Sequence, residues 1–170
     1  TLTPYVYHVQ CVNLERDEQD RWNQLTLEIR KKSAQFLGAD APCPDAELRL
    51  KLLLIRRARI LKGARQKVAA AVSVLTTAYR RGQHWIVYCD DLVQLRSVRD
   101  ALRCAGCTDV LEYHTAMVGD PQQTLGLFET QGGIVVSIRC LDEGVDIPAV
   151  SHALILASSK NPREFVQRRG

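Results

Sequence analysis

The chain has 170 residues and a net charge of +4, and it is 46% hydrophobic and 25% charged. These values are typical of an ordinary globular domain and exclude collagen, a coiled coil and global disorder. No apolar run approaches the roughly 20 residues that span a bilayer and no signal peptide opens the chain, so we expect no membrane partner. Because the chain starts at Thr1 and ends in a helix-like stretch at Gly170, we interpret it as a piece of a longer polypeptide.

Residues 1–82 are predicted to form an N-terminal strand and a helical segment. Alternating side chains indicate the strand, and apolar residues at helical spacing indicate the helices. A turn with two prolines, residues 38–44, separates the first two helices. The predicted elements are a strand over Tyr5–Val12 and helices over Glu15–Phe36, Ala46–Leu61 and Arg65–Arg80.

Residues 83–170 are predicted to form an α/β domain. The predicted strands are Trp85–Cys89, Val110–Tyr113, Gly133–Ser137 and Ala153–Ala157, and the predicted helices are Leu92–Cys104, Pro121–Phe128 and one that starts at Pro162. Strands that are apolar throughout and alternate with helices are typical of a parallel sheet covered on both faces. We therefore expect a three-layer domain with a parallel sheet flanked by helices.

The basic residues are concentrated in one segment. Between Leu48 and Lys67 there are eight cations and no acid, and without these eight the acidic residues of the chain would outnumber the basic ones. A local basic cluster is what binding to a polyanion requires. A solvated helix face that happens to be basic is the alternative, and the sequence leaves the two interpretations open.

The six cysteines do not form a recognisable metal site. Cys104 and Cys107 are the one close pair, and a zinc site normally needs a second pair or two histidines. His114 is the one other ligand nearby. We therefore predict no metal, and unpaired cysteines fit a protein of the reducing cytoplasm.

Common catalytic motifs are missing from the sequence. It contains no G-x-x-x-x-G-K-[ST] phosphate loop, no G-x-G-x-x-G and no G-x-S-x-G. Asp142 and Glu143 imitate a Walker B pair, but they do not directly end an apolar strand. A phosphate-loop NTPase, a dinucleotide-binding enzyme and an α/β-hydrolase are therefore not supported.

Two segments follow predicted strands and carry groups that suit a nucleotide. In open parallel sheets the loops at the carboxyl ends of strands form the ligand crevice. In Ser137–Pro148, Gly144 lets the backbone approach a ligand and Asp146 can accept hydrogen bonds from a ribose. Asn161–Gly170 brings three arginines, whose planar fork suits phosphate oxygens. Exposed ion pairs at the sheet edge are the alternative interpretation.

These segments carry a resemblance to superfamily two helicases. Leu141–Pro148 (LDEGVDIP) resembles motif V, Gln167–Gly170 (QRRG) resembles the opening of motif VI, and Trp85–Cys89 resembles the motif IV strand. The order of the three also matches. Among these helicases the chain is most similar to bacterial DEAD/DEAH-type proteins grouped with XPB-like and type III restriction translocases. Relatives of this kind also carry a tyrosine-rich first strand and a basic helix before motif IV.

The resemblance implies the C-terminal RecA-like lobe of an ATP-dependent DNA helicase or translocase. The partners would be the N-terminal RecA-like lobe of the same polypeptide and DNA, with RNA as an open alternative. ATP and Mg²⁺ would be bound mainly by the N-terminal lobe, and the arginine fingers would follow Gly170. The fragment alone would therefore bind no cofactor and hydrolyse no ATP. The implied nucleotide-facing residues are Gly144, Asp146 and Gln167, and the nucleic-acid-facing residues are Ser137, Arg139, Arg56, Arg57 and Arg59.

Two other functions remain open at this stage. One is a nucleic-acid-binding module with a degenerate RecA-like fold that does not hydrolyse ATP, which the basic segment favours. The other is a small-molecule enzyme that uses Asp142, Glu143 or His114 for acid–base chemistry.

Overall fold

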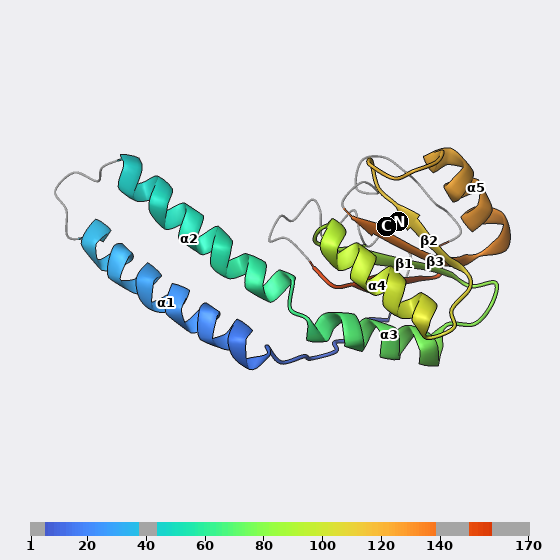
Figure 1. Ribbon diagram of the computed structural model, residues 1–170, viewed down its shortest axis with the longest axis horizontal. Coiled ribbons are helices and arrows are strands. Elements are labelled where there is room, and N and C mark those ends of the chain that lie inside the picture. The colour runs from blue at the N-terminus through green and yellow to red at the C-terminus, as the bar shows by residue number, and fades with distance from the viewer. Residues whose placement is uncertain (1–5, 38–43, 139–149, 158–170) are drawn as a thin grey trace. The chain divides into compact units, whose positions relative to one another are not determined.

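The computed structural model describes residues 6–37, 44–138 and 150–157 (Figure 1). The elements in chain order are α1 (Arg16–Leu37), α2 (Pro44–Lys62), α3 (Gln66–Ala78), β1 (His84–Cys89), α4 (Leu92–Cys104), β2 (Val110–Tyr113), α5 (Pro121–Gln131), β3 (Gly133–Ile138) and β4 (His152–Ile155). The chain divides into two compact units, residues 13–66 and residues 1–12 with 67–170. Each unit is described separately below.

The larger unit contains a four-stranded parallel sheet with the order β2-β3-β1-β4. The α/β fold class and the four predicted strands of this sheet are confirmed. β1 and β3 are the central strands, and their residues are almost all buried, because helices cover both faces of the sheet. α3 packs on this sheet, whereas the sequence analysis assigns it to the preceding segment, residues 1–82.

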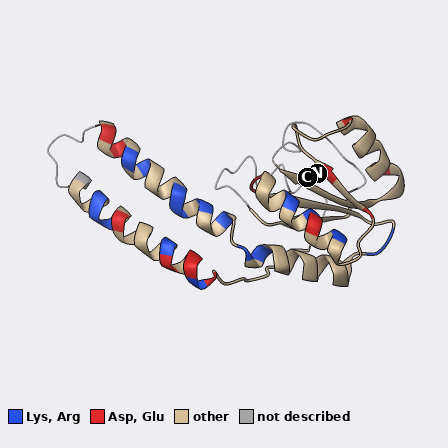
Figure 2. Cartoon of the chain, in the orientation of Figure 1, with Lys and Arg blue, Asp and Glu red and all other residues tan. Residues whose placement is uncertain are grey.

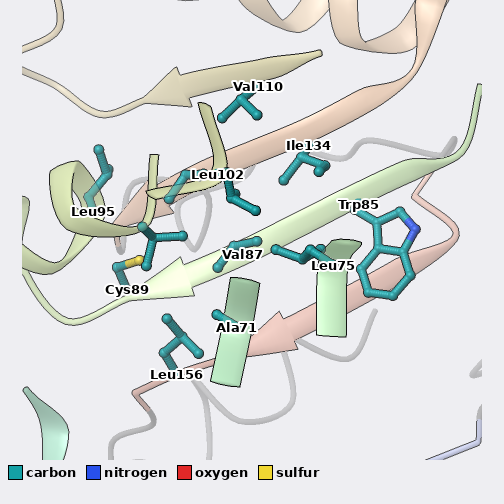
Figure 3. Packing of buried hydrophobic residues seen from close by; sticks show 12 residues of the cluster. Ala71, Leu75, Trp85, Val87, Cys89, Leu95, Leu102, Val110, Ile134 and Leu156 are labelled. Atoms are coloured by element: carbon teal, nitrogen blue, oxygen red, sulfur yellow. The ribbon is translucent and has the colours of Figure 1, made fainter. Parts of the chain in front are cut away.

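Alternate residues of each central strand enter two different cores. On one face, Trp85, Val87 and Cys89 of β1 pack with side chains from α3 and α4 (Figure 3). On the other face, Ile86 and Tyr88 pack with side chains from α5. This division follows from the two-residue period of a strand, which sends successive side chains to opposite faces. The helix face of the first core is formed by Ala71 and Leu75 of α3 and by Leu95, Val98 and Leu102 of α4.

The smaller unit is a hairpin in which α1 and α2 lie side by side (Figure 1). Ile29 of α1 and Leu53 of α2 are buried in the seam. At the open end of the hairpin, the Glu18 carboxylate accepts hydrogen bonds from the backbone N–H groups of Glu15 (2.9 Å) and Arg65 (3.0 Å). One buried carboxylate therefore satisfies the start of α1 and holds the segment after α2.

The predicted strand over Tyr5–Val12 is wrong for the part that the structure describes. Residues 6–12 form no strand, and the side chains of Val6, Tyr7 and Val9 are exposed. Alternation predicts which side chains share a face, but a strand also needs a neighbouring backbone to pair with. The helix predicted from Pro162 lies outside the described residues.

Gly133 allows β3 to start beside the loop before β2. Its φ is +128°, and a Cβ built there would lie 2.8 Å from the Asp109 carbonyl oxygen. We expect Gly133→Ala to lower the free energy of unfolding by about 1–3 kcal/mol, because L side chains rarely adopt this conformation and the added carbon meets backbone. Chemical denaturation of the purified chain measures the change.

Gly126→Ala is the matched control, because Gly126 lies inside α5 and a Cβ there meets nothing within 4 Å. This variant is expected to gain about 0.5–1 kcal/mol. Equal effects of the two substitutions would show that the β3 start does not require glycine.

Candidate functional site at the carboxyl edge of the sheet

The carboxyl ends of the parallel strands bring polar residues to one edge of the sheet. Ser137, next to last in β3, pairs with Tyr88 of β1 on one side and with Tyr113 of β2 on the other. His114 follows β2, and Asp90 follows β1. The edge therefore combines residues from segments that are far apart in the sequence.

Ser137 is the unusual group at this edge. It is fully buried, and its Oγ has no hydrogen-bond partner within the described part of the chain. A buried hydroxyl without a partner costs about 1–3 kcal/mol. By strand alternation Ser137 shares the α5 face of the sheet with Val135, and it lies between Tyr88 and Tyr113 of the neighbouring strands. Ser137 is therefore a buried polar group with unused hydrogen-bonding capacity at the carboxyl edge of the sheet.

The loop after β1 is held by its own polar side chains. Asp91 caps α4, because its Oδ1 accepts a hydrogen bond from the Gln94 N–H (2.8 Å). The buried Gln94 in turn accepts a hydrogen bond at Oε1 from the Asp90 N–H (2.8 Å). Sequence reasoning missed this arrangement, although Asp-x-x-Gln directly after an apolar strand is the spacing of a helix start.

Cys89 is the last residue of β1 and directly precedes this loop. Burial, and after it the negative charge of Asp91, raises the pKa of the Cys89 thiol to about 12. The protonated thiol is therefore a small apolar core residue at neutral pH and not a nucleophile.

Lys67 supplies a cation to the end of β4. Its Nζ donates a hydrogen bond to the Leu156 carbonyl oxygen (2.7 Å), which connects the first turn of α3 to the carboxyl end of the sheet. The sequence places Lys67 in the basic segment but does not separate it from the cations of α2. Its contact with Leu156 assigns it to the sheet unit.

His114 lies in the turn that follows β2. It is buried, and its Nδ1 accepts a hydrogen bond from the Ala116 N–H (3.2 Å). Its Nε2 lies 3.9 Å from Oε1 of Glu112, which also pairs with Arg99. These contacts give the ring a structural role and do not favour the acid–base enzyme. Asp142 and Glu143 lie outside the described residues.

The three predicted arginines of α2 differ in their surroundings. Arg56 and Arg59 are exposed. Arg57 is half-buried against α1, where its guanidinium carbon lies 5.5 Å from the centre of the Trp22 ring and its Nη1 lies 3.5 Å from the Thr26 hydroxyl. Arg57 is therefore engaged within the hairpin. Gly144, Asp146, Gln167 and Arg139 lie outside the described residues.

In the ranges 6–37, 44–138 and 150–157, no three His, Cys, Asp or Glu side chains gather in a way that would hold a metal ion. None of the helices in those ranges has the length and apolar character needed to cross a membrane.

Comparison with known proteins identifies the class to which this fold and edge belong. Residues 66–170 match the family described as "Helicase conserved C-terminal domain". The chain therefore belongs to this family, which confirms the resemblance to a helicase C-terminal lobe inferred from the motifs. No curated protein matches the chain significantly in sequence.

Two solved structures show the same fold at low sequence identity. The "Sulfolobus solfataricus SWI2/SNF2 ATPase C-terminal domain" has a TM-score of 0.64 at 9% identity, covering 84% of this chain and 68% of that chain. The Pyrococcus furiosus Hef helicase domain has a TM-score of 0.50 at 14% identity. That match covers 89% of this chain, which spans 31% of the Hef helicase domain.

Replacing Ser137 tests whether its hydroxyl is unsatisfied. We expect Ser137→Ala to raise the free energy of unfolding by about 1 kcal/mol, because it removes a buried polar atom that has no partner. Ser151→Ala is the control: its Oγ accepts from the His84 N–H (3.1 Å) and donates to the His84 carbonyl (3.0 Å), so its loss should cost about 0.5–1.5 kcal/mol. Chemical denaturation measures both, and a loss in the Ser137 variant would contradict the interpretation.

Thiol labelling tests the state of Cys89. At neutral pH, iodoacetamide should modify the exposed Cys104 and leave Cys89 unmodified, because the reactive thiolate of Cys89 becomes abundant only near its pKa of about 12. Mass spectrometry of the digested protein gives the result for each cysteine. Labelling in denaturant should abolish the difference. Fast modification of Cys89 in the folded chain would refute its assignment to the core.

Proposed function

We propose that this lobe is the second motor lobe of an ATP-dependent DNA helicase or translocase, and that it closes on ATP held by an N-terminal lobe of the same polypeptide. The observation that carries the proposal is the buried, unsatisfied hydroxyl of Ser137 at the carboxyl edge of a helicase C-terminal sheet. It lies upstream of the segment that resembles motif V, with Ile138, Arg139 and Cys140 between them. A hydroxyl without a hydrogen-bond partner at this edge is available to bond to a ligand from outside the lobe.

In the proposed mechanism, the residues of the segments 137–148 and 161–170 keep the roles that the resemblance implies. Ser137 and Arg139 would contact the nucleic-acid backbone, whose phosphates give affinity without base readout. Gly144, Asp146 and Gln167 would face the nucleotide. ATP and Mg²⁺ would be held mainly by the N-terminal lobe, so the fragment alone would not hydrolyse ATP. Opening and closing of the two lobes would convert ATP turnover into movement along the strand.

A second candidate is a nucleic-acid-binding module that does not hydrolyse ATP. The exposed cations of α2 favour it, because lysine and arginine release counterions from phosphates whatever the sequence of bases. The two candidates differ in whether ATP changes the affinity for nucleic acid.

ATP turnover by the full-length polypeptide, with and without single-stranded and double-stranded DNA, tests the proposal. We expect DNA to raise turnover in the wild type and in Ser97→Ala, a control that makes the same substitution on the exposed surface of α4. Asp146→Ala should abolish turnover. Ser137→Ala should keep the turnover measured without DNA and reduce the stimulation by DNA about tenfold, since one hydrogen bond to a charged phosphate is lost.

Two results would count against the motor. Folded protein that binds DNA with no turnover under any condition would favour the binding module. Full stimulation in Ser137→Ala would remove the observation on which the proposed nucleic-acid contact depends.

A further inference from the structure

The outer face of α2 is an apolar stripe that no described residue of the hairpin covers. We define this outer face by Leu48, Leu52 and Ile55, with Lys51, Arg56 and Arg59 around them. The spacing of four and three residues places the three apolar side chains in one line along the helix. They are 56%, 46% and 41% exposed, respectively.

The opposite side of the same helix is the one that packs in the hairpin. Leu53 is buried in the seam with α1, and Arg57 lies against Trp22. The seam therefore accounts for one apolar line of α2 and leaves the second without a partner among the described residues of the hairpin. Single exposed leucines are common on protein surfaces, but three in line have the pattern of a helix that packs on both sides.

The charges around the stripe indicate what would fit it. α2 carries six cations and two acids, and both acids lie in the first turn (Figure 2). No ion pair involves the side chains of Lys51, Arg56 or Arg59 in the part of the chain that the structure describes. A complementary surface would have an apolar centre and an acidic rim.

Two other occupants fit this face less well. A nucleic acid would satisfy the cations with its phosphates but would leave the leucines in the middle of the face against a polar backbone. A second copy of α2 would cover the leucines but would bring the central Lys51 and Arg56 against cations of their own kind.

We propose that the outer face of α2 binds an amphipathic helix with an acidic rim, supplied by a separate protein partner. The leucines of that helix would pack on Leu48, Leu52 and Ile55, and its carboxylates would reach the cations on either side. This inference does not depend on motor activity, because it concerns the hairpin and not the edge of the sheet.

A synthetic helix tests the proposal directly. The probe is a fluorescent peptide with leucines at alternating three- and four-residue spacing and glutamates beside them, titrated into the purified chain. We expect saturable binding that weakens about tenfold or more in Leu48→Gln/Leu52→Gln/Ile55→Gln, since a few apolar contacts dominate such an interface. Leu27→Gln, a 57% exposed leucine on α1, is the matched control and should change binding less than about twofold.

A charge exchange tests the cations beside the stripe separately, with variants that leave the three apolar side chains unchanged. Lys51→Glu/Arg59→Glu should bind the glutamate peptide about tenfold more weakly, and it should gain binding to the same peptide with lysines in place of glutamates. All substituted side chains are exposed, so the circular dichroism of the variants should match that of the wild type.

Several outcomes would overturn the proposal. Equal binding of a scrambled peptide of the same composition would show a charge effect without a docking face. Binding that survives the triple substitution would exclude the stripe. Duplex DNA that competes fully with the peptide and loses affinity in the triple variant would identify the face as a nucleic-acid site. A wild-type chain that sediments as a dimer and becomes monomeric in the triple variant would identify a second copy as the occupant.

Discussion

The burial of β1 and β3 on both faces is the constraint on which the sheet unit depends. Helices α3 and α4 cover one face and α5 covers the other, so neither face of the central strands can hold a polar side chain without a partner. Polar chemistry is therefore confined to the ends of the strands. At the carboxyl edge, the structure meets this constraint with two hydrogen bonds: Gln94 Oε1 accepts one from the Asp90 N–H, and Lys67 Nζ donates one to the Leu156 carbonyl oxygen. Ser137 is the exception, which is why it stands out as a candidate contact.

The hairpin of α1 and α2 is stabilised in a different way from the sheet unit. Two helices share one buried seam, so most of their surface stays exposed. The backbone N–H groups at the end of the seam still need hydrogen-bond partners. The Glu18 carboxylate is that partner, because it accepts hydrogen bonds from the backbone at the start of α1 and at Arg65 after α2. With the seam satisfied, the remaining apolar line of α2 is not required for the hairpin itself. The cations around this line are the reason for proposing it as a docking face.

The helicase assignment rests on two kinds of observation that agree. Short motifs in the sequence indicate a helicase C-terminal lobe, and the family match over residues 66–170 confirms it. The parallel sheet brings the carboxyl ends of all its strands to one edge, which is where ligands bind in open parallel sheets. Two solved structures share this fold at 9% and 14% identity, so the arrangement of strands and helices persists where little of the sequence does.

The sequence by itself determined the helices and the sheet strands, because buried parallel strands require continuous apolar runs and helices require a periodic apolar line. It also determined the helicase class, through motifs that are local. Only the tertiary structure decided the rest. Residues 6–12 alternate but form no strand, since pairing needs a second backbone, and Arg57 is separated from Arg56 and Arg59 by its contact with Trp22. The unsatisfied hydroxyl of Ser137 depends on its register between Tyr88 and Tyr113, which are distant in the chain, and no local pattern carries that information.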